Sequence, residues 1–187
     1  MTEAGGVRTV LKRWQPLLIL LAMLWAVEVV NLVSGRALNG FGIVPRQVSG
    51  LAGIVAAPFL HGSLSHIMAN TAALLVLGGL LALRGARAFV GVTAALAIIS
   101  GLAVWCFARP AVHIGASGVI FGYFGYLVAL GWYERTPAAL FIALVVAFIY
   151  GGMLWGLLPS GNGVSWEAHV AGFGAGVLAA SWQARRV

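Results

Sequence analysis

The chain has 187 residues, of which 61% are hydrophobic and 8% charged, and its mean hydropathy is +1.01. This composition excludes a soluble globular protein and indicates an integral membrane protein. A net charge of +7 would suggest nucleic-acid binding in a soluble protein, but in a membrane chain basic residues report loop orientation, so we expect no nucleic-acid partner.

Six apolar stretches are long enough to cross a hydrocarbon core of about 30 Å as helices of about 20 residues. All six prolines lie at or outside the edges of these stretches, as expected if the stretches are helical. We therefore expect an all-α bundle of six transmembrane helices in a single domain, residues 1–187, with a short cytoplasmic segment at residues 1–14. The predicted spans are about 15–34, 61–83, 88–108, 115–133, 138–158 and 168–184.

The basic residues predict the orientation. Eight of them fall on the side that carries both chain ends and three on the other side, so the positive-inside rule places both termini in the cytoplasm of a multi-pass cell-membrane protein. The first group is Arg8, Lys12, Arg13, Arg84, Arg87, Arg135, Arg185 and Arg186, and the second is Arg36, Arg46 and Arg109. The first outer connection, about residues 35–60, is long and partly apolar, so we expect it to pack on or into the membrane surface.

The second, fourth and sixth spans all run from outside to inside, so their first residues lie at the same outer depth. These positions carry His61, His66, Asn70, Ser117 and His169. Polar side chains that converge in one leaflet indicate a buried site.

Ser117 is the residue around which this site is organised. Gly115 and Gly118 remove side-chain bulk on either side of it, and we expect it to lie about one turn into its span. A serine hydroxyl needs a base to act as a nucleophile, and the best candidate is His169, which opens the sixth span.

Glycines at small-x-x-x-small spacing follow both residues. Gly118 and Gly122 lie on the fourth span, and Gly172 and Gly176 on the sixth. We expect these faces to pack together and so to bring Ser117 to His169.

These residues resemble the rhomboid family of six-span intramembrane serine proteases, and the likeness covers nearly the whole chain. Three motifs agree in order and spacing: His61 with His66-x-x-x-Asn70, then Gly115-Ala-Ser117-Gly118, then Ala168-His169-x-x-Gly172-x-x-x-Gly176.

The resemblance implies that Ser117 is the nucleophile and His169 the general base, with an oxyanion site formed by His66, Asn70 and the Ser117 backbone N–H. It implies a structural role for His61. Phe121 stands where some family members have a tyrosine that stacks on the catalytic histidine, so stacking is retained and the phenol oxygen is lost.

The sequence contains no aspartate, which excludes an aspartyl protease and a Ser-His-Asp triad, and the His-Glu-x-x-His zinc motif is absent. Since Cys106 is the single cysteine, we expect no cysteine metal cluster, and no metal or cofactor is predicted. Glu28 lies within the first span; it is protonated, hydrogen-bonded across helices, wetted by the site, or orients His169. His113 is a second base, a substrate contact or, as we favour, a loop anchor.

The sequence therefore predicts a serine endopeptidase that cleaves transmembrane protein substrates in the lipid bilayer, near the outer face. The alternative is a catalytically inactive relative that binds membrane helices. A small transporter would show inverted repeats with broken helices, and neither is present in the sequence.

Overall fold

The computed structural model describes residues 3–160 and 163–185, with side chains from residue 10 onward. Its longer helices are α1 (Glu3–Val33), α3 (Leu64–Ala73), α5 (Ala86–Phe107), α6 (Ser117–Glu134), α7 (Pro137–Tyr150) and α8 (Trp166–Ala184). Its short helical elements are η1 (Ala37–Phe41), η2 (Val48–Leu51), α2 (Gly53–Ala56), η3 (Ala57–Phe59), η4 (Leu74–Gly78), α4 (Gly79–Ala82) and η5 (Gly151–Leu157). The described residues contain no strand, so the all-α fold class is confirmed.

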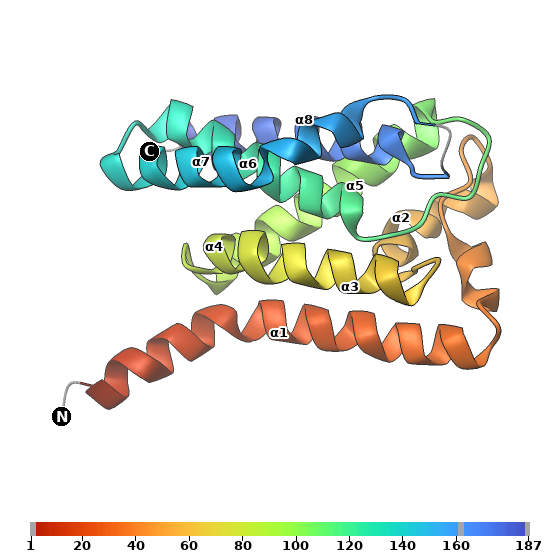
Figure 1. Ribbon diagram of the computed structural model, residues 1–187, viewed down its shortest axis with the longest axis horizontal. Coiled ribbons are helices and arrows are strands. Elements are labelled where there is room, and N and C mark those ends of the chain that lie inside the picture. Colours follow the sequence, from red (N-terminus) through yellow and green to blue (C-terminus); the bar gives the residue numbers. More distant parts are fainter. Residues whose placement is uncertain (1–2, 161–162, 186–187) are drawn as a thin grey trace.

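Helices occupy each of the six predicted ranges. The second range is one continuous helix in which η4, a π-helical turn, joins α3 to α4, and the fifth continues from α7 into η5. The first helix differs from the expectation, because α1 begins at Glu3 and contains Pro16 in its interior. A proline inside a helix removes one hydrogen bond and bends the helix, and Figure 1 shows α1 bending away from the bundle in its N-terminal part.

In the part of the chain that the structure describes, four helical stretches are long and apolar enough to cross a membrane: Val10–Val33, Leu64–Ala82, Ala86–Phe107 and Pro137–Leu157. The chain is therefore a multi-pass membrane protein. The helices α6 and α8 are rich in glycine, and α6 is buried along most of its length.

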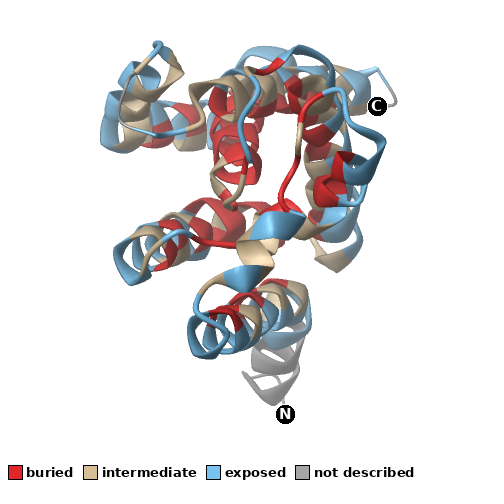
Figure 2. Cartoon of the chain, turned by 90° about the vertical axis from the view of Figure 1, so that its right-hand side faces the viewer, coloured by how far each residue is buried: buried red, intermediate tan, exposed pale blue. Residues whose placement is uncertain are grey.

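The helices are arranged around α6, which packs against α8 and α7, while α5 packs against α8 and α1 lies along one edge (Figure 1). The first residues of α3 and α8 lie at the right-hand end of Figure 1, and the start of α1 and the end of α8 at the left. Viewed from that right-hand end, buried residues gather toward the inside of the bundle and exposed residues cover its periphery (Figure 2). The site residues thus share the end opposite to the two chain ends.

Glycines allow α6 and α8 to touch backbone to backbone. A Cβ atom added to Gly172 would lie 1.9 Å from the Gly118 carbonyl oxygen, and one added to Gly176 would lie 2.1 Å from the Gly122 carbonyl oxygen. Since a Cβ atom cannot approach an oxygen so closely, the spacing of the two helices depends on these glycines.

The first outer connection is compact rather than extended. It contains η1, η2, α2 and η3, and its Ile54 packs so closely on α5 that a Cβ atom at Gly101 would lie 2.7 Å from Ile54 Cγ2. An isolated antiparallel bridge joins Ile43 of this connection to His113, just before α6. The connection therefore supports the loop that leads into the candidate nucleophile.

Candidate active site

Ser117 is the first residue of α6, so it lies at the helix start and not one turn inside it as we expected. The chain reaches it through Gly115, whose φ of +114° favours glycine and whose N–H donates to the Ala57 carbonyl of the first connection at 2.8 Å. At the start of a helix the backbone N–H groups lack partners within the helix and form the positive end of its dipole. The Ser117 N–H therefore belongs to a set of donors suited to an anion.

The structure places His169 directly against Ser117. The His169 Nε2 atom lies 3.0 Å from Ser117 Oγ, and Nδ1 lies 2.9 Å from the Gly156 carbonyl oxygen at the end of η5. A carbonyl oxygen only accepts, so in this geometry Nδ1 carries the proton and the Nε2 lone pair faces the serine hydroxyl. This is the tautomer that a general base requires.

Phe121 holds the imidazole from one face. Its ring stacks on the His169 ring with a centroid separation of 4.0 Å and an interplanar angle of 7°. Because Phe121 lies one turn after Ser117 on the same helix, α6 supplies both the candidate nucleophile and the ring that packs on the candidate base.

His66 and Asn70 project from one face of α3, one turn apart. Ser63 caps the start of this helix, since its hydroxyl accepts from the His66 N–H at 3.1 Å. The His66 ring approaches the loop before Ser117 so closely that a Cβ atom at Gly115 would lie 2.8 Å from His66 Cε1. Gly115 is thus required for this approach as well as for its backbone conformation.

His61 lies in the loop before α3 and contacts Asn70, with its Nε2 atom 3.0 Å from the Asn70 side-chain nitrogen. Burial lowers the pKa of His61 to about 4, so the ring is neutral at pH 7 and can accept from this amide. The amide has a second N–H, which remains available to a ligand.

The dyad and the two α3 side chains line one cavity of about 590 Å³, together with Tyr150 of α7 and Met153 of η5. This cavity therefore brings together four of the predicted site residues: His66, Asn70, Ser117 and His169. Among the described residues no three His, Cys, Asp or Glu side chains are grouped to hold a metal ion.

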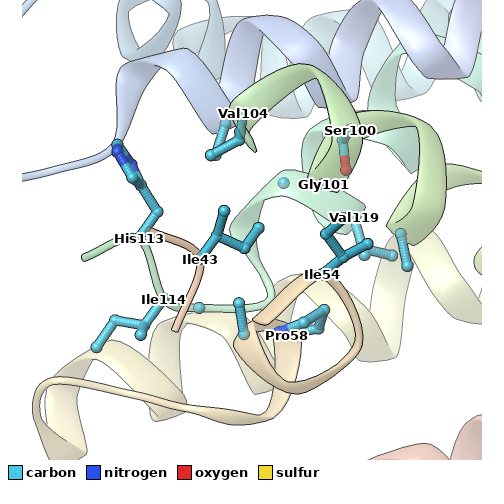
Figure 3. A pocket seen from close by; sticks show the side chains of 14 residues that line it. Ile43, Ile54, Pro58, Ser100, Gly101, Val104, His113, Ile114 and Val119 are labelled. Carbon is cyan, nitrogen blue, oxygen red and sulfur yellow. The ribbon is translucent and has the colours of Figure 1, made fainter. Parts of the chain in front are cut away.

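His113 lies outside the dyad. Its Nε2–H donates to the Arg109 carbonyl at 3.0 Å, so its Nδ1 accepts from the Ser165 hydroxyl at 2.6 Å. Ser165 also caps α8 by accepting from the Ala168 N–H. His113 thus ties the loop before α6 to the start of α8, beside a second cavity of about 30 Å³ that it lines with Ile43 and Ser100 (Figure 3).

Each glutamate whose side chain is described pairs with an arginine. Glu28 is buried and bonds Arg36 at 2.9 Å, Glu134 bonds Arg84, and Glu167 lies 3.5 Å from Arg109. Glu28 therefore makes a polar contact with Arg36, and it does not bond the His169 ring, whose nitrogens contact Gly156 and Ser117. The Arg36 guanidinium also donates to the His61 carbonyl, so this pair holds the first connection against α3.

One partner of the base was not expected from the sequence. The Gly156 carbonyl accepts from His169, but its neighbours in the sequence are all apolar residues and glycines. A sequence pattern reveals side chains and not main-chain oxygens, so nothing in this segment predicted the contact.

Comparisons with known proteins identify the family of the chain. The Rhomboid domain family matches residues 45–186. Uncharacterized proteins of Mycobacterium tuberculosis and Mycobacterium bovis are 43% identical over 173 residues, covering 88% of this chain and 72% of theirs. An uncharacterized protein of Mycobacterium leprae is 39% identical over the same share of this chain and 68% of its own. The family match spans most of the chain and the relatives are similar across its bundle, so this protein belongs to the rhomboid family.

Proposed function

We propose that the protein is an intramembrane serine endopeptidase that uses a Ser117–His169 dyad. The observation that carries the proposal is the 3.0 Å contact between Ser117 Oγ and His169 Nε2, with Nδ1 donating to a carbonyl. In the reaction Ser117 Oγ attacks the scissile carbonyl while His169 Nε2 takes its proton. The imidazolium then gives that proton to the leaving amine, and water hydrolyses the acyl-enzyme by the same route.

The oxyanion of the tetrahedral intermediate would lie between the start of α6 and α3. The Ser117 N–H, the free N–H of Asn70 and the His66 ring are its donors, since all three residues line the same cavity. One such donor contributes about 3 kcal/mol to transition-state stabilisation in a water-poor site.

The substrates we propose are transmembrane segments of other proteins. Transmembrane helices hide their peptide bonds, and unpaired backbone groups cost several kcal/mol each in lipid, so the scissile segment must unwind at the cavity. Segments with glycine or proline near their outer end unwind most readily, because these residues cost about 1 and about 3 kcal/mol in a helix.

The test is cleavage of a panel of single-span substrates by the purified protein, together with labelling by a fluorophosphonate that reacts with activated serines. We expect cleavage and labelling by the wild type, and loss of both in Ser117→Ala and His169→Ala. Ser181→Ala is the matched control, since this half-buried serine lies near the other end of α8 and its hydroxyl donates to the Leu178 carbonyl. Cleavage of the same bond by Ser117→Ala would show that another group is the nucleophile.

The same panel tests the second candidate, an inactive relative that binds membrane helices. That reading predicts substrate capture with neither cleavage nor labelling in the wild type. The presence of the dyad in bonding geometry favours the enzyme.

We also propose that the cavity opens at the outer face of the cell membrane, with both termini in the cytoplasm. In a Cys106→Ala background, cysteines at the exposed positions Val48 and Arg87 report the two ends of the bundle. An impermeant thiol reagent should label position 48 in intact cells and position 87 only after permeabilisation. The reverse pattern would move the site to the cytoplasmic leaflet.

A further inference from the structure

The Gly156 carbonyl occupies the place, relative to His169, that a carboxylate occupies in a serine protease triad. It accepts from Nδ1–H at 2.9 Å while Nε2 faces Ser117. The described glutamates all pair with arginines, and Glu167, two residues before His169 in the chain, lies against Arg109. The two ring nitrogens of His169 contact Gly156 O and Ser117 Oγ, so no described carboxylate bonds the imidazole.

The local sequence leaves this carbonyl open to the imidazole. Gly156 lies near the end of η5, a 3-10 helix, in which each carbonyl accepts from the N–H three residues later. The carbonyl before it follows this rule, since the Leu158 N–H donates to Trp155 O at 3.2 Å. For Gly156 the residue three positions later is Pro159, which has no N–H.

The glycine is needed for the close approach. A Cβ atom at position 156 would lie 2.8 Å from Phe121 Cζ and 3.4 Å from His169 Nδ1. Because Phe121 is itself stacked on the imidazole, a side chain at 156 would push the carbonyl away from Nδ1 or disturb the stack.

We propose that Gly156 is a positioning residue whose main-chain carbonyl, left without a helical partner by Pro159, selects the Nδ1–H tautomer of His169 and aims Nε2 at Ser117. The inference rests on the proposed dyad for its catalytic consequence, but the tautomer itself is a property of the resting protein. The main-chain carbonyl would thus replace the acidic residue of a triad, because it keeps the proton on Nδ1 and leaves Nε2 free to accept the serine proton.

The experiment measures the tautomer directly, by nitrogen NMR of the full chain labelled with ¹⁵N-histidine in detergent micelles at a pH where His169 is neutral. The His169 signals are assigned by their loss in His169→Asn. In the wild type we expect a protonated Nδ1 and an unprotonated Nε2. In Gly156→Ala we expect a mixture of tautomers, with kcat reduced about tenfold by loss of one hydrogen bond and KM little changed.

Two further variants supply an independent test and a matched control. Pro159→Ala adds an N–H that competes for the Gly156 carbonyl without adding a side chain beside Phe121, so we expect the same change of tautomer in smaller measure. Gly152→Ala is the matched control in the same 3-10 helix, because a Cβ atom there has open space, and it should keep wild-type spectra and kcat.

The outcomes separate the two proposals. A wild-type His169 tautomer and kcat in both Gly156→Ala and Pro159→Ala overturn the positioning role and leave the protease standing. If Gly156→Ala does not fold, Pro159→Ala decides alone. A wild type that never cleaves or labels overturns the proposed function, while its His169 spectrum still shows whether Nδ1 is the protonated nitrogen. An unprotonated Nδ1 would overturn the inference by itself.

Discussion

The α6–α8 interface and the outer surface of α7 and η5 lie on either side of His169 and are packed in opposite ways. At the interface, Gly172 and Gly176 of α8 lie against the Gly118 and Gly122 carbonyls of α6, and an added Cβ atom would lie 1.9 Å from the first oxygen and 2.1 Å from the second. Only 11% of the apolar stretch Pro137–Leu157 is buried, compared with 39% for Leu64–Ala82, and its large side chains such as Phe148 point away from the bundle.

This difference separates two requirements of the site. The distance between Ser117 and His169 is determined by α6 and α8, whose contact leaves little freedom. The orientation of the base and one wall of the cavity come from α7 and η5, which fewer buried contacts hold in place. Substitutions should therefore be most damaging between α6 and α8, intermediate around the cavity, and least damaging on the outer surface of α7.

The largest effect is expected for Gly172→Ala. Its Cβ atom would fall 1.9 Å from the Gly118 carbonyl oxygen, so the helices must separate and the dyad with them. We expect a loss of at least about 3 kcal/mol in the free energy of unfolding, and no detectable cleavage. Gly174→Ala, at a position with open space on the same helix, should match the wild type. Unfolding in detergent and cleavage measure both, and an active, stable Gly172→Ala would disprove the close-packing argument.

Asn70→Ala should have the next largest effect. It removes one proposed oxyanion donor without altering the dyad, so kcat should fall by about 10² to 10³ while weak activity remains. Thr71→Ala is the control on the same helix, since this hydroxyl faces α1 and accepts from the Trp25 indole. Steady-state kinetics compare the two, and equal kcat values would exclude Asn70 from the oxyanion site.

Phe121 tests the stack on the base. Phe121→Tyr preserves the aromatic face and should leave kcat within about twofold of the wild type. Phe121→Leu loses the stacking interaction, whose value of about 0.5–1.5 kcal/mol corresponds to a decrease of about twofold to tenfold. A larger decrease in the tyrosine variant than in the leucine variant would contradict a role in stacking.

The smallest effect is expected for Phe148→Ala. This side chain is 91% exposed on α7, so its truncation removes lipid contacts and no protein packing. Stability should change by less than about 0.5 kcal/mol, and cleavage by less than about twofold. A loss comparable to that of Asn70→Ala would show that the outer surface of α7 binds a functional partner, such as the substrate helix.

The sequence alone determined the class of the protein and was sufficient to propose the residues of the dyad. Hydropathy and the positions of the prolines are local properties, so they predict membrane helices without knowledge of how the helices pack. The spacing of His66 and Asn70 is likewise local, because residues four apart share a helix face. The glycines near Ser117 and His169 indicated where two helices can approach, and the structure brings those glycines into contact.

Only the tertiary structure decided which groups surround the base. The bond from His169 to the Gly156 carbonyl, the bond from His113 to Ser165 and the pairing of Glu28 with Arg36 depend on where separate segments lie in space. The fold of the first connection and the start of α6 at Ser117 were also not predicted, since both depend on contacts between residues 42–57 and the loop before α6. The physical reason is that a hydrogen bond to a main-chain carbonyl requires a position and an orientation, and every residue in the sequence carries the same carbonyl.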